Sequence, residues 1–143
     1  MEKAIIVYGS TTGNTETLSR ALEEELAQRF EVTRKDVIDT DPHEVLNYDL
    51  IVLGSSTWSD GELQEDFQDF YEEMDTIDLA GKKVAVFGPG DSNWDDSFCK
   101  AVDILEAKAR ERRATLVAPG FKWDGEIDDQ ALTEIKKWGT QLH

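Results

Sequence analysis

Four short runs of apolar residues stand out along the chain, and within them apolar residues do not clearly alternate with polar ones. Such runs, rich in Val, Ile, Leu or Ala, are typical of strands that are buried on both faces of a sheet. They cover residues 4–8, 50–53, 84–87 and 115–118. Residues 30–37 alternate and carry charges, which is typical of a strand at the edge of a sheet. The pattern predicts five strands.

Segments with helical spacing lie between these runs, because apolar side chains recur there every three or four residues. Four apolar faces are formed by Leu18, Leu22, Leu26 and Phe30; by Leu63, Phe67, Phe70 and Met74; by Phe98, Val102, Leu105 and Ala109; and by Leu132, Ile135, Trp138 and Leu142. A short helix is predicted around residues 43–47, after the capping pair Asp41-Pro42. Trp123 is interpreted either as a residue that covers an apolar patch or as a residue at the rim of the ligand site.

Strands that alternate with helices predict an α/β fold with a parallel sheet, right-handed crossovers and helices on both faces. For five strands the leading topology is a doubly wound sheet in the order 2-1-3-4-5. The order reverses between strands 1 and 3, and ligands bind outside the carboxyl ends of the strands around that point. The loops after Tyr8, Leu53 and Phe87 are therefore the candidate ligand-binding loops.

Length and composition predict a single domain that spans residues 1–143, because the 39% of hydrophobic residues are spread over the whole chain without a linker or repeat. The first residues are too few and too polar for a signal peptide or a membrane span, which predicts a soluble, cytoplasmic protein. The single cysteine, Cys99, is interpreted as a structural thiol. One cysteine and two histidines predict no metal site built from these residue types.

The charge is strongly negative, with 31 acidic against 15 basic residues and a net charge of −16. Nucleic acids and anionic membranes repel such a surface, so we expect neither as a partner. Basic patches on other proteins are the expected partners. The alternative is that the charge only keeps the protein soluble.

The first candidate loop lies in the segment YGSTTGNTET, which has five Ser and Thr hydroxyls but no Lys or Arg. Its glycine spacing matches neither the dinucleotide nor the nucleoside triphosphate pattern, and the missing lysine argues against phosphoryl transfer. A helix follows, so backbone N–H groups at its N-terminus add to the side-chain donors. Those side chains are Ser10, Thr11, Thr12, Asn14 and Thr15. The loop predicts a phosphate monoester site; the alternative is an ordinary helix cap.

The second and third loops each place a tryptophan among polar and acidic residues. The second loop, GSSTWSDGELQEDF, repeats the hydroxyl cluster with Ser55, Ser56 and Thr57 and then has Trp58. The third, GPGDSNWDDSF, contains Trp94. Two indoles at the mouth of one sheet suggest surfaces that flank a flat ligand, although each alone could cover a local apolar patch. With the phosphate site, they predict a mononucleotide such as FMN.

These residues carry a resemblance to a known family. The segments GSTTGNTE, GSSTW and FGPGDSNW match, in order and spacing, the three flavin loops of short-chain bacterial flavodoxins like those of sulfate-reducing bacteria. The similarity covers essentially the full length, and the three motifs together are highly specific. The resemblance implies a flavodoxin-like fold, noncovalently bound FMN and one-electron transfer between redox proteins.

The resemblance also implies which residues bind FMN. The first loop and Ser56 would bind the phosphate, and Trp58 and Trp94 would stack on the isoalloxazine. Gly90 and Asp91 would lie along the pyrimidine edge of the flavin. The complete set of predicted cofactor-binding residues is Ser10, Thr11, Thr12, Gly13, Asn14, Thr15, Ser55, Ser56, Thr57, Trp58, Ser59, Gly61, Gly88, Pro89, Gly90, Asp91 and Trp94.

The chain departs from the family pattern directly after the loop tryptophan. Relatives usually have a glycine there, whose peptide flips when the flavin takes up its first electron and proton. In this chain the position is Ser59, and a glycine follows only at Gly61. Because a residue with a Cβ resists positive φ, the flip either is costlier at Ser59 or uses Gly61 instead.

By this resemblance the protein is a monomeric, low-potential electron carrier without catalytic residues. Carboxylates that would lower the flavin potential are Asp60, Glu62, Asp91, Asp95 and Asp96. Reductases, cytochromes or other acceptors would approach an acidic rim of Asp60, Glu62, Glu65, Asp66, Asp95 and Asp96. The alternatives are an FMN-dependent reductase of a small molecule, which needs an open pocket beside the ring, and a binding module without flavin.

Overall fold

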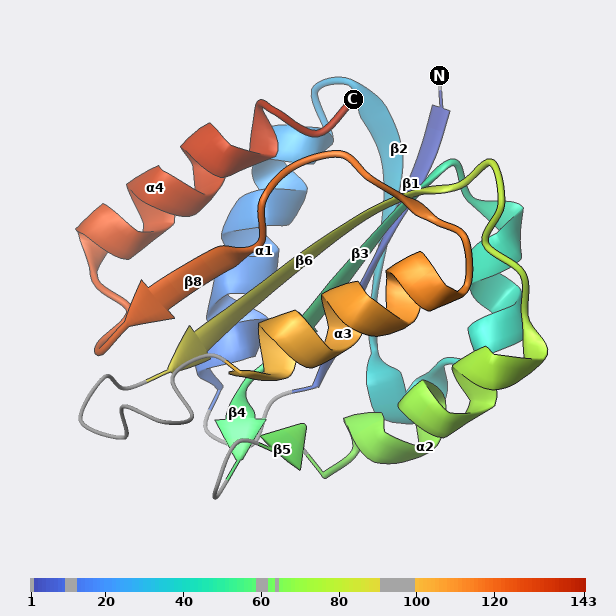
Figure 1. Ribbon diagram of the computed structural model, residues 1–143. Helices are drawn as coiled ribbons and strands as arrows, with labels where there is room; N and C mark the ends of the chain where they lie inside the picture. Colours follow the sequence, from blue (N-terminus) through green and yellow to red (C-terminus); the bar gives the residue numbers. More distant parts are fainter. Residues whose placement is uncertain (1, 10–12, 59–61, 64, 91–99) are drawn as a thin grey trace.

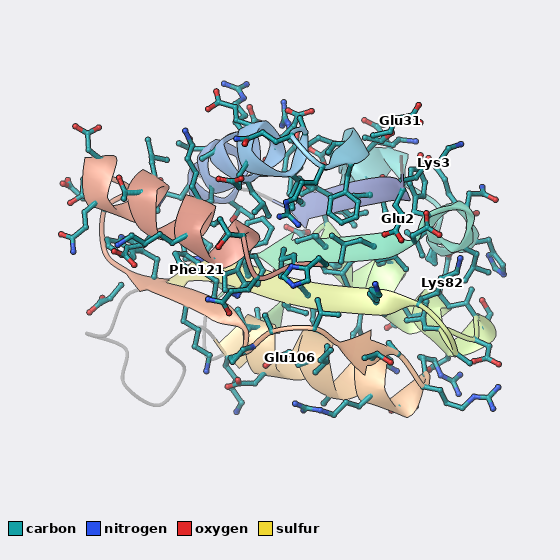
Figure 2. All side chains as sticks on the ribbon, turned by 90° about the horizontal axis from the view of Figure 1, so that it is seen from above. Glu2, Lys3, Glu31, Lys82, Glu106 and Phe121 are labelled. Carbon is teal, nitrogen blue, oxygen red and sulfur yellow. The ribbon has the colours of Figure 1, made fainter. Side chains whose placement is uncertain are left out.

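The computed structural model describes residues 2–9, 13–58, 62, 63, 65–90 and 100–143. A parallel sheet lies between two layers of helices, with α1 and α4 on one face and α2 and α3 on the other (Figure 1). Figure 2, which looks along the layers from above, shows Phe121 on the α4 side of the sheet and Glu106 on the α3 side. Both helical layers predicted from the sequence are therefore present.

The sheet confirms the predicted doubly wound topology. Its strands are β1 (Glu2–Gly9), β2 (Phe30–Asp36), β3 (Leu50–Ser55), β6 (Lys83–Gly90), β7 (Thr115–Leu116) and β8 (Phe121–Asp124). They run parallel in the order β2-β1-β3-β6, and both β7 and β8 pair with β6. The fifth position of the order 2-1-3-4-5 is thus occupied by two short strands that follow each other along β6.

The predicted fifth strand was wrong in extent, since only Thr115 and Leu116 of residues 115–118 are extended and β8 was missed. The strand breaks before Phe121. Pro119 has no backbone N–H for a ladder, and its carbonyl instead accepts a bond of 2.8 Å from the Trp138 indole. Gly120 passes so close to α3 that a Cβ there would lie 2.5 Å from Cγ1 of Val102.

The α-helices are α1 (Asn14–Leu26), α2 (Phe67–Glu73), α3 (Lys100–Glu111) and α4 (Asp129–Gly139), and the 3-10 helices are η1 (Val37–Asp39), η2 (Pro42–Asn47) and η3 (Met74–Thr76). The short helix predicted at residues 43–47 is η2, and Asp41 caps it by accepting a 2.8 Å bond from the N–H of His43. The prediction that Leu63 shares the second helix was wrong, because Leu63 lies in a small hairpin of β4 (Thr57–Trp58) and β5 (Glu62–Leu63). Phe98 lies outside the described residues.

The core explains why the central strands show no alternation. Alternate residues of β1, β3 and β6 point into two separate apolar clusters, one under α2 and α3 and the other under α1 and α4. Ile5 and Val7 join the first cluster, whereas Ala4 and Ile6 join the second. Trp123 also packs against the second cluster and stacks on Phe121, so it is a covering residue.

No helix in the described ranges is long and apolar enough to cross a membrane.

An ion pair between a buried lysine and an exposed aspartate joins α3 to η3, which follows α2. The ammonium of Lys108, whose side chain is only 7% exposed, lies 2.5 Å from Oδ1 of Asp75. The same ammonium lies 4.4 Å from the centre of the Tyr71 ring. The hydrogen bond from Lys108 lowers the pKa of Asp75 from its ordinary value of 3.8 and raises that of Lys108 from 10.5.

We expect Asp75→Asn to destabilise the protein at pH 7, because the buried ammonium of Lys108 would lose its nearest carboxylate and keep, among the described residues, only Glu111, whose Oε1 lies 4.0 Å away. The pKa of Asp75 is lower in the folded state, so the pair stabilises above about pH 3.8 and the contribution is lost as the pH falls through the folded pKa. Urea unfolding at pH 7 and pH 3 measures this. The exposed Glu72 provides the matched control, and a Glu72→Gln variant as unstable as Asp75→Asn would contradict the pairing.

Candidate functional site

Three strand ends meet at one edge of the sheet. β1, β3 and β6 are parallel neighbours, and Gly9 at the end of β1 is in register with Ser55 at the end of β3. β6 continues beside them to Gly90. The three predicted ligand loops therefore start side by side at the point where the strand order reverses, as Figure 1 shows for the strands themselves.

The first loop enters α1 through Gly13, which has a φ of 92° and precedes the helix as its N-cap. A glycine fits this position because residues with a Cβ rarely adopt such an angle. No side chain caps the helix at Gly13. The hydroxyl of Thr17 bonds back to the Gly13 carbonyl at 2.9 Å, so it does not point forward from the helix end. The positive end of the α1 dipole thus faces the first loop.

Thr15 is the most informative residue of this turn. It is 1% exposed, and its Oγ1 atom has no hydrogen-bond partner within the described residues. Buried hydroxyls are nearly always bonded, because leaving one unpaired costs about 1–3 kcal/mol. Among the described residues, the first turn of α1 thus has a buried hydroxyl that is available to donate a hydrogen bond.

The second loop begins with two serines in different environments. Ser55 is buried, and its hydroxyl donates a 2.9 Å bond to the carbonyl of Ser56. Ser56 itself is half-buried. Thr57 and Trp58 then form β4, where the backbone of Trp58 pairs with Glu62. The second loop thus doubles back on itself as a small hairpin at the edge of the site.

The third loop leaves the sheet through Gly88, Pro89 and Gly90. A Cβ on Gly88 would lie 2.3 Å from the carbonyl oxygen of Ser55, so the backbone of β3 leaves no room for a side chain at this position of β6. Pro89 is buried and in register with Trp123 of β8. The carbonyl of Gly90 accepts a 2.9 Å bond from the N–H of Gly125. β8 therefore holds the last described residues of this loop in place.

Comparison with known proteins assigns the family. A family model described as flavodoxin matches residues 6–138. The chain is 42% identical to the flavodoxin of Maridesulfovibrio salexigens, over 99% of this chain and 97% of that one. It is 38% identical to probable flavodoxin 2 of Bacillus subtilis, over 99% and 95% of the two chains. The chain belongs to the flavodoxin family.

Solved structures agree with this assignment. Oxidised flavodoxin 2 from Bacillus cereus superposes with a TM-score of 0.93 at 40% identity, over 98% of this chain and 97% of that one. A flavodoxin of Fusobacterium nucleatum bound to flavin mononucleotide has a TM-score of 0.84 at 18% identity, over 99% and 97% of the chains, and supports the fold alone.

Membership of the flavodoxin family confirms the class predicted from the three motifs. Flavodoxins are electron-transfer proteins rather than enzymes, and FMN is the cofactor of the family. The described part of the site fits this cofactor, because an orphaned hydroxyl and a helix N-terminus stand where its phosphate is predicted.

The structure brings together part of the predicted set. Residues of the set that it describes at the start of α1 are Gly13, Asn14 and Thr15, and those at the ends of β3 and β6 are Ser55, Ser56, Gly88, Pro89 and Gly90. Only the backbone of Thr57 and Trp58 is described. Residues of the predicted set that lie outside the described residues are Ser10, Thr11, Thr12, Ser59, Gly61, Asp91 and Trp94. Their roles stay predictions.

Sequence reasoning assigned no role to Gly54, the first residue of the second loop. A Cβ there would lie 2.2 Å from the Phe87 ring, so this glycine lets β3 and β6 pack around the aromatic side chain. A glycine inside an apolar strand run often marks such a close approach, and that signal was present in residues 50–55.

Proposed function

We propose that this flavodoxin holds FMN with its phosphate at the N-terminus of α1 and carries single electrons, at low potential, to redox proteins with basic surfaces. The Thr15 hydroxyl, which is buried without a partner among the described residues, is the observation that supports this phosphate position. Phosphate oxygens are strong acceptors, and a hydroxyl that donates to one is no longer unsatisfied. The dipole of α1 favours the same negative group.

The other phosphate donors are proposed from the sequence and from their position. Asn14 is exposed in the same turn as Thr15, and Ser56 is half-buried at the start of the second loop. Ser10, Thr11 and Thr12 complete the set on the first loop. Trp58 and Trp94 are proposed to flank the isoalloxazine, with Gly90 and Asp91 along its pyrimidine edge.

Bound FMN supplies the one-electron chemistry, and the residues of the chain bind it and tune it. The tuning is proposed to come from Asp60, Glu62, Asp91, Asp95 and Asp96 in the second and third loops. At about 10 Å in a water-like dielectric each carboxylate opposes added negative charge by roughly 0.4 kcal/mol. Several together reach about 1–2 kcal/mol, which lowers the potential of the second reduction by some tens of millivolts.

The visible absorption spectrum of the purified protein tests the function directly. We expect flavin bands that correspond to one FMN per chain and that reappear when FMN is added to apoprotein. A chain that stays colourless after FMN addition would overturn the proposal. A single folding unit, a monomeric state and a cytoplasmic location remain predictions from the sequence.

The net charge of −16 predicts that electron transfer to basic partner proteins depends on ionic strength. The rate of electron transfer to a lysine-rich c-type cytochrome should fall about tenfold or more between low and high ionic strength, because salt screens the attraction. Stopped-flow kinetics of the reduced protein measure this rate. Ferricyanide is the control: its negative charge should make its rate rise with salt. Equal rates at both salt concentrations for the cytochrome would contradict steering by charge.

A further inference from the structure

A cavity of about 370 Å³ lies between η1, η2 and α2. We call it the η1–α2 groove; Val37, Ile38 and Pro42 line one bank, and Asp69, Phe70 and Glu73 line the other. Val37, Pro42 and Phe70 are buried, so they give the groove an apolar floor. The carboxylates of α2 stand along its rim. The phosphate and stacking sites proposed for FMN use none of these residues.

Ile38 borders the groove and is 68% exposed, the only large hydrophobic side chain with such exposure in the described ranges. Single exposed apolar residues are common, but this one stands beside a cavity with an apolar floor. Two hydrogen bonds to Asp36 also order the backbone around Ile38. The Asp36 carboxylate accepts a 3.0 Å bond from the N–H of Ile38, and the Asp36 carbonyl accepts a 2.8 Å bond from the Thr40 hydroxyl. A partner that covers Ile38 therefore meets an apolar side chain on a preorganised backbone turn.

The opposite bank is an acidic face of α2. Asp69 and Glu73 are four residues apart and share one side of the helix, and Glu65 lines the groove just before the helix begins. Among the described residues none of these three carboxylates forms an ion pair. The chain has fourteen Asp and Glu but no Lys or Arg between Lys35 and Lys82, the stretch that supplies both banks.

The groove lies at the functional edge of the molecule. η1 directly follows the carboxyl end of β2, and α2 follows the hairpin of the second loop. α2 and η1 lie against each other at the end of the sheet where the parallel strands finish (Figure 1). A protein that approaches the second loop therefore meets the groove with the same face.

We propose that a redox partner docks in the η1–α2 groove by inserting an apolar side chain that Lys or Arg residues flank. The apolar side chain would cover Ile38 and fill the floor, while the cations would pair with Glu65, Asp69 and Glu73. Charge complementarity selects this occupant over a second copy of the chain, whose acidic surface would be repelled. The inference rests on the proposed electron-carrier function and adds a position and an apolar anchor to it.

The test uses the FMN-loaded protein and a lysine-rich c-type cytochrome as the probe. Calorimetry with both proteins oxidised measures binding without electron transfer, and stopped-flow kinetics measure the transfer rate. Ile38→Ser should raise the dissociation constant about tenfold, because it removes most of a buried apolar side chain from the contact. Asp69→Asn combined with Glu73→Gln should raise it about tenfold as well and reduce its salt dependence. The affinity for FMN should not change.

Glu72→Gln is the matched control, because Glu72 is an exposed carboxylate on α2 that does not line the groove. It should change the dissociation constant by less than about twofold, because an exposed charge outside the groove contributes little to binding. If Ile38→Ser binds like wild type, or if Glu72→Gln and Glu73→Gln are equally harmful, the groove is not the docking site. The proposed function would then still stand. A wild-type protein that binds FMN but transfers no electron to the cytochrome would instead overturn the proposed function.

Discussion

Thr15→Val should lower the affinity for FMN about ten- to a hundredfold, because it removes a hydrogen bond to a charged phosphate worth about 1.5–3 kcal/mol. Valine has nearly the shape of threonine, so the buried turn of α1 should keep its packing. Riboflavin has the same ring but no phosphate, and its affinity should not change. Titration of apoprotein with each flavin, followed by the quenching of flavin fluorescence, separates the two effects.

The same substitution should stabilise the apoprotein. The Thr15 hydroxyl is buried without a partner among the described residues, and an apolar methyl at that place relieves a cost of about 1–3 kcal/mol. Thr15→Val should therefore raise the urea midpoint without FMN and lower the gain in stability that FMN provides. Opposite effects on the empty and the loaded protein would distinguish a lost ligand contact from a general loss of packing.

Thr17→Val is the control for this pair of effects. Thr17 stands in the same turn, but it is exposed and its hydroxyl already donates to the Gly13 carbonyl. We expect its FMN affinity to match that of wild type. Equal losses for FMN and riboflavin in Thr15→Val would show that the residue shapes the site without contacting the phosphate.

The central part of the fold could be predicted because burial on both faces leaves a direct trace in the sequence. Residues 50–53 are all apolar, and the structure divides them between the two clusters under opposite helical layers. β8 left no such trace. Lys122 and Asp124 alternate with aromatic residues, and the preceding Pro119-Gly120 looks like the start of a loop. Its pairing with β6 is a tertiary contact that no local pattern encodes.

The start of the second helix was misplaced for a related reason. Leu63 has the right spacing to precede Phe67 on an apolar face, and periodicity alone cannot exclude it. In the structure the backbone of Leu63 pairs with Thr57 in the hairpin, so the helix begins at Phe67. The helical spacing of Leu63 and Phe67 permits a helix that includes both residues, but it does not require one. The pairing of Leu63 with Thr57, six residues earlier, decides the structure instead.

The proposed position of the FMN site follows from the topology of the sheet, but the sequence does not show which of its residues matters most. In the sequence Thr15 is one of several equivalent hydroxyls, and the structure adds that it is buried without a partner among the described residues. The η1–α2 groove was not predictable at all. Ile38 and Asp69 are far apart in the chain, and nothing in the sequence shows that this isoleucine is exposed while Val37 beside it is buried.

Gly88→Ala should lower the free energy of unfolding by about 3 kcal/mol and also weaken FMN binding, because overpacking against rigid backbone has no easy relief. The added Cβ would lie 2.3 Å from the Ser55 carbonyl and 3.0 Å from Cγ2 of Val102. β3 and β6 must separate to make room, and both lead directly into the loops proposed to bind FMN. Urea unfolding of the apoprotein and an FMN titration measure the two losses.

Two other glycines separate the causes of this effect. Gly81 has a φ of +82°, and a Cβ added there would meet no described atom within 4 Å, so Gly81→Ala should cost about 1 kcal/mol through backbone strain alone and leave FMN affinity unchanged. In Gly54→Ala the added Cβ would lie 2.2 Å from the Phe87 ring, and a second substitution can replace this ring with a smaller side chain. Phe87→Leu should therefore rescue much of the loss in Gly54→Ala but little of the loss in Gly88→Ala. Equal rescue of both variants would show that the ring, and not the backbone contact at Ser55, limits the spacing of the two strands.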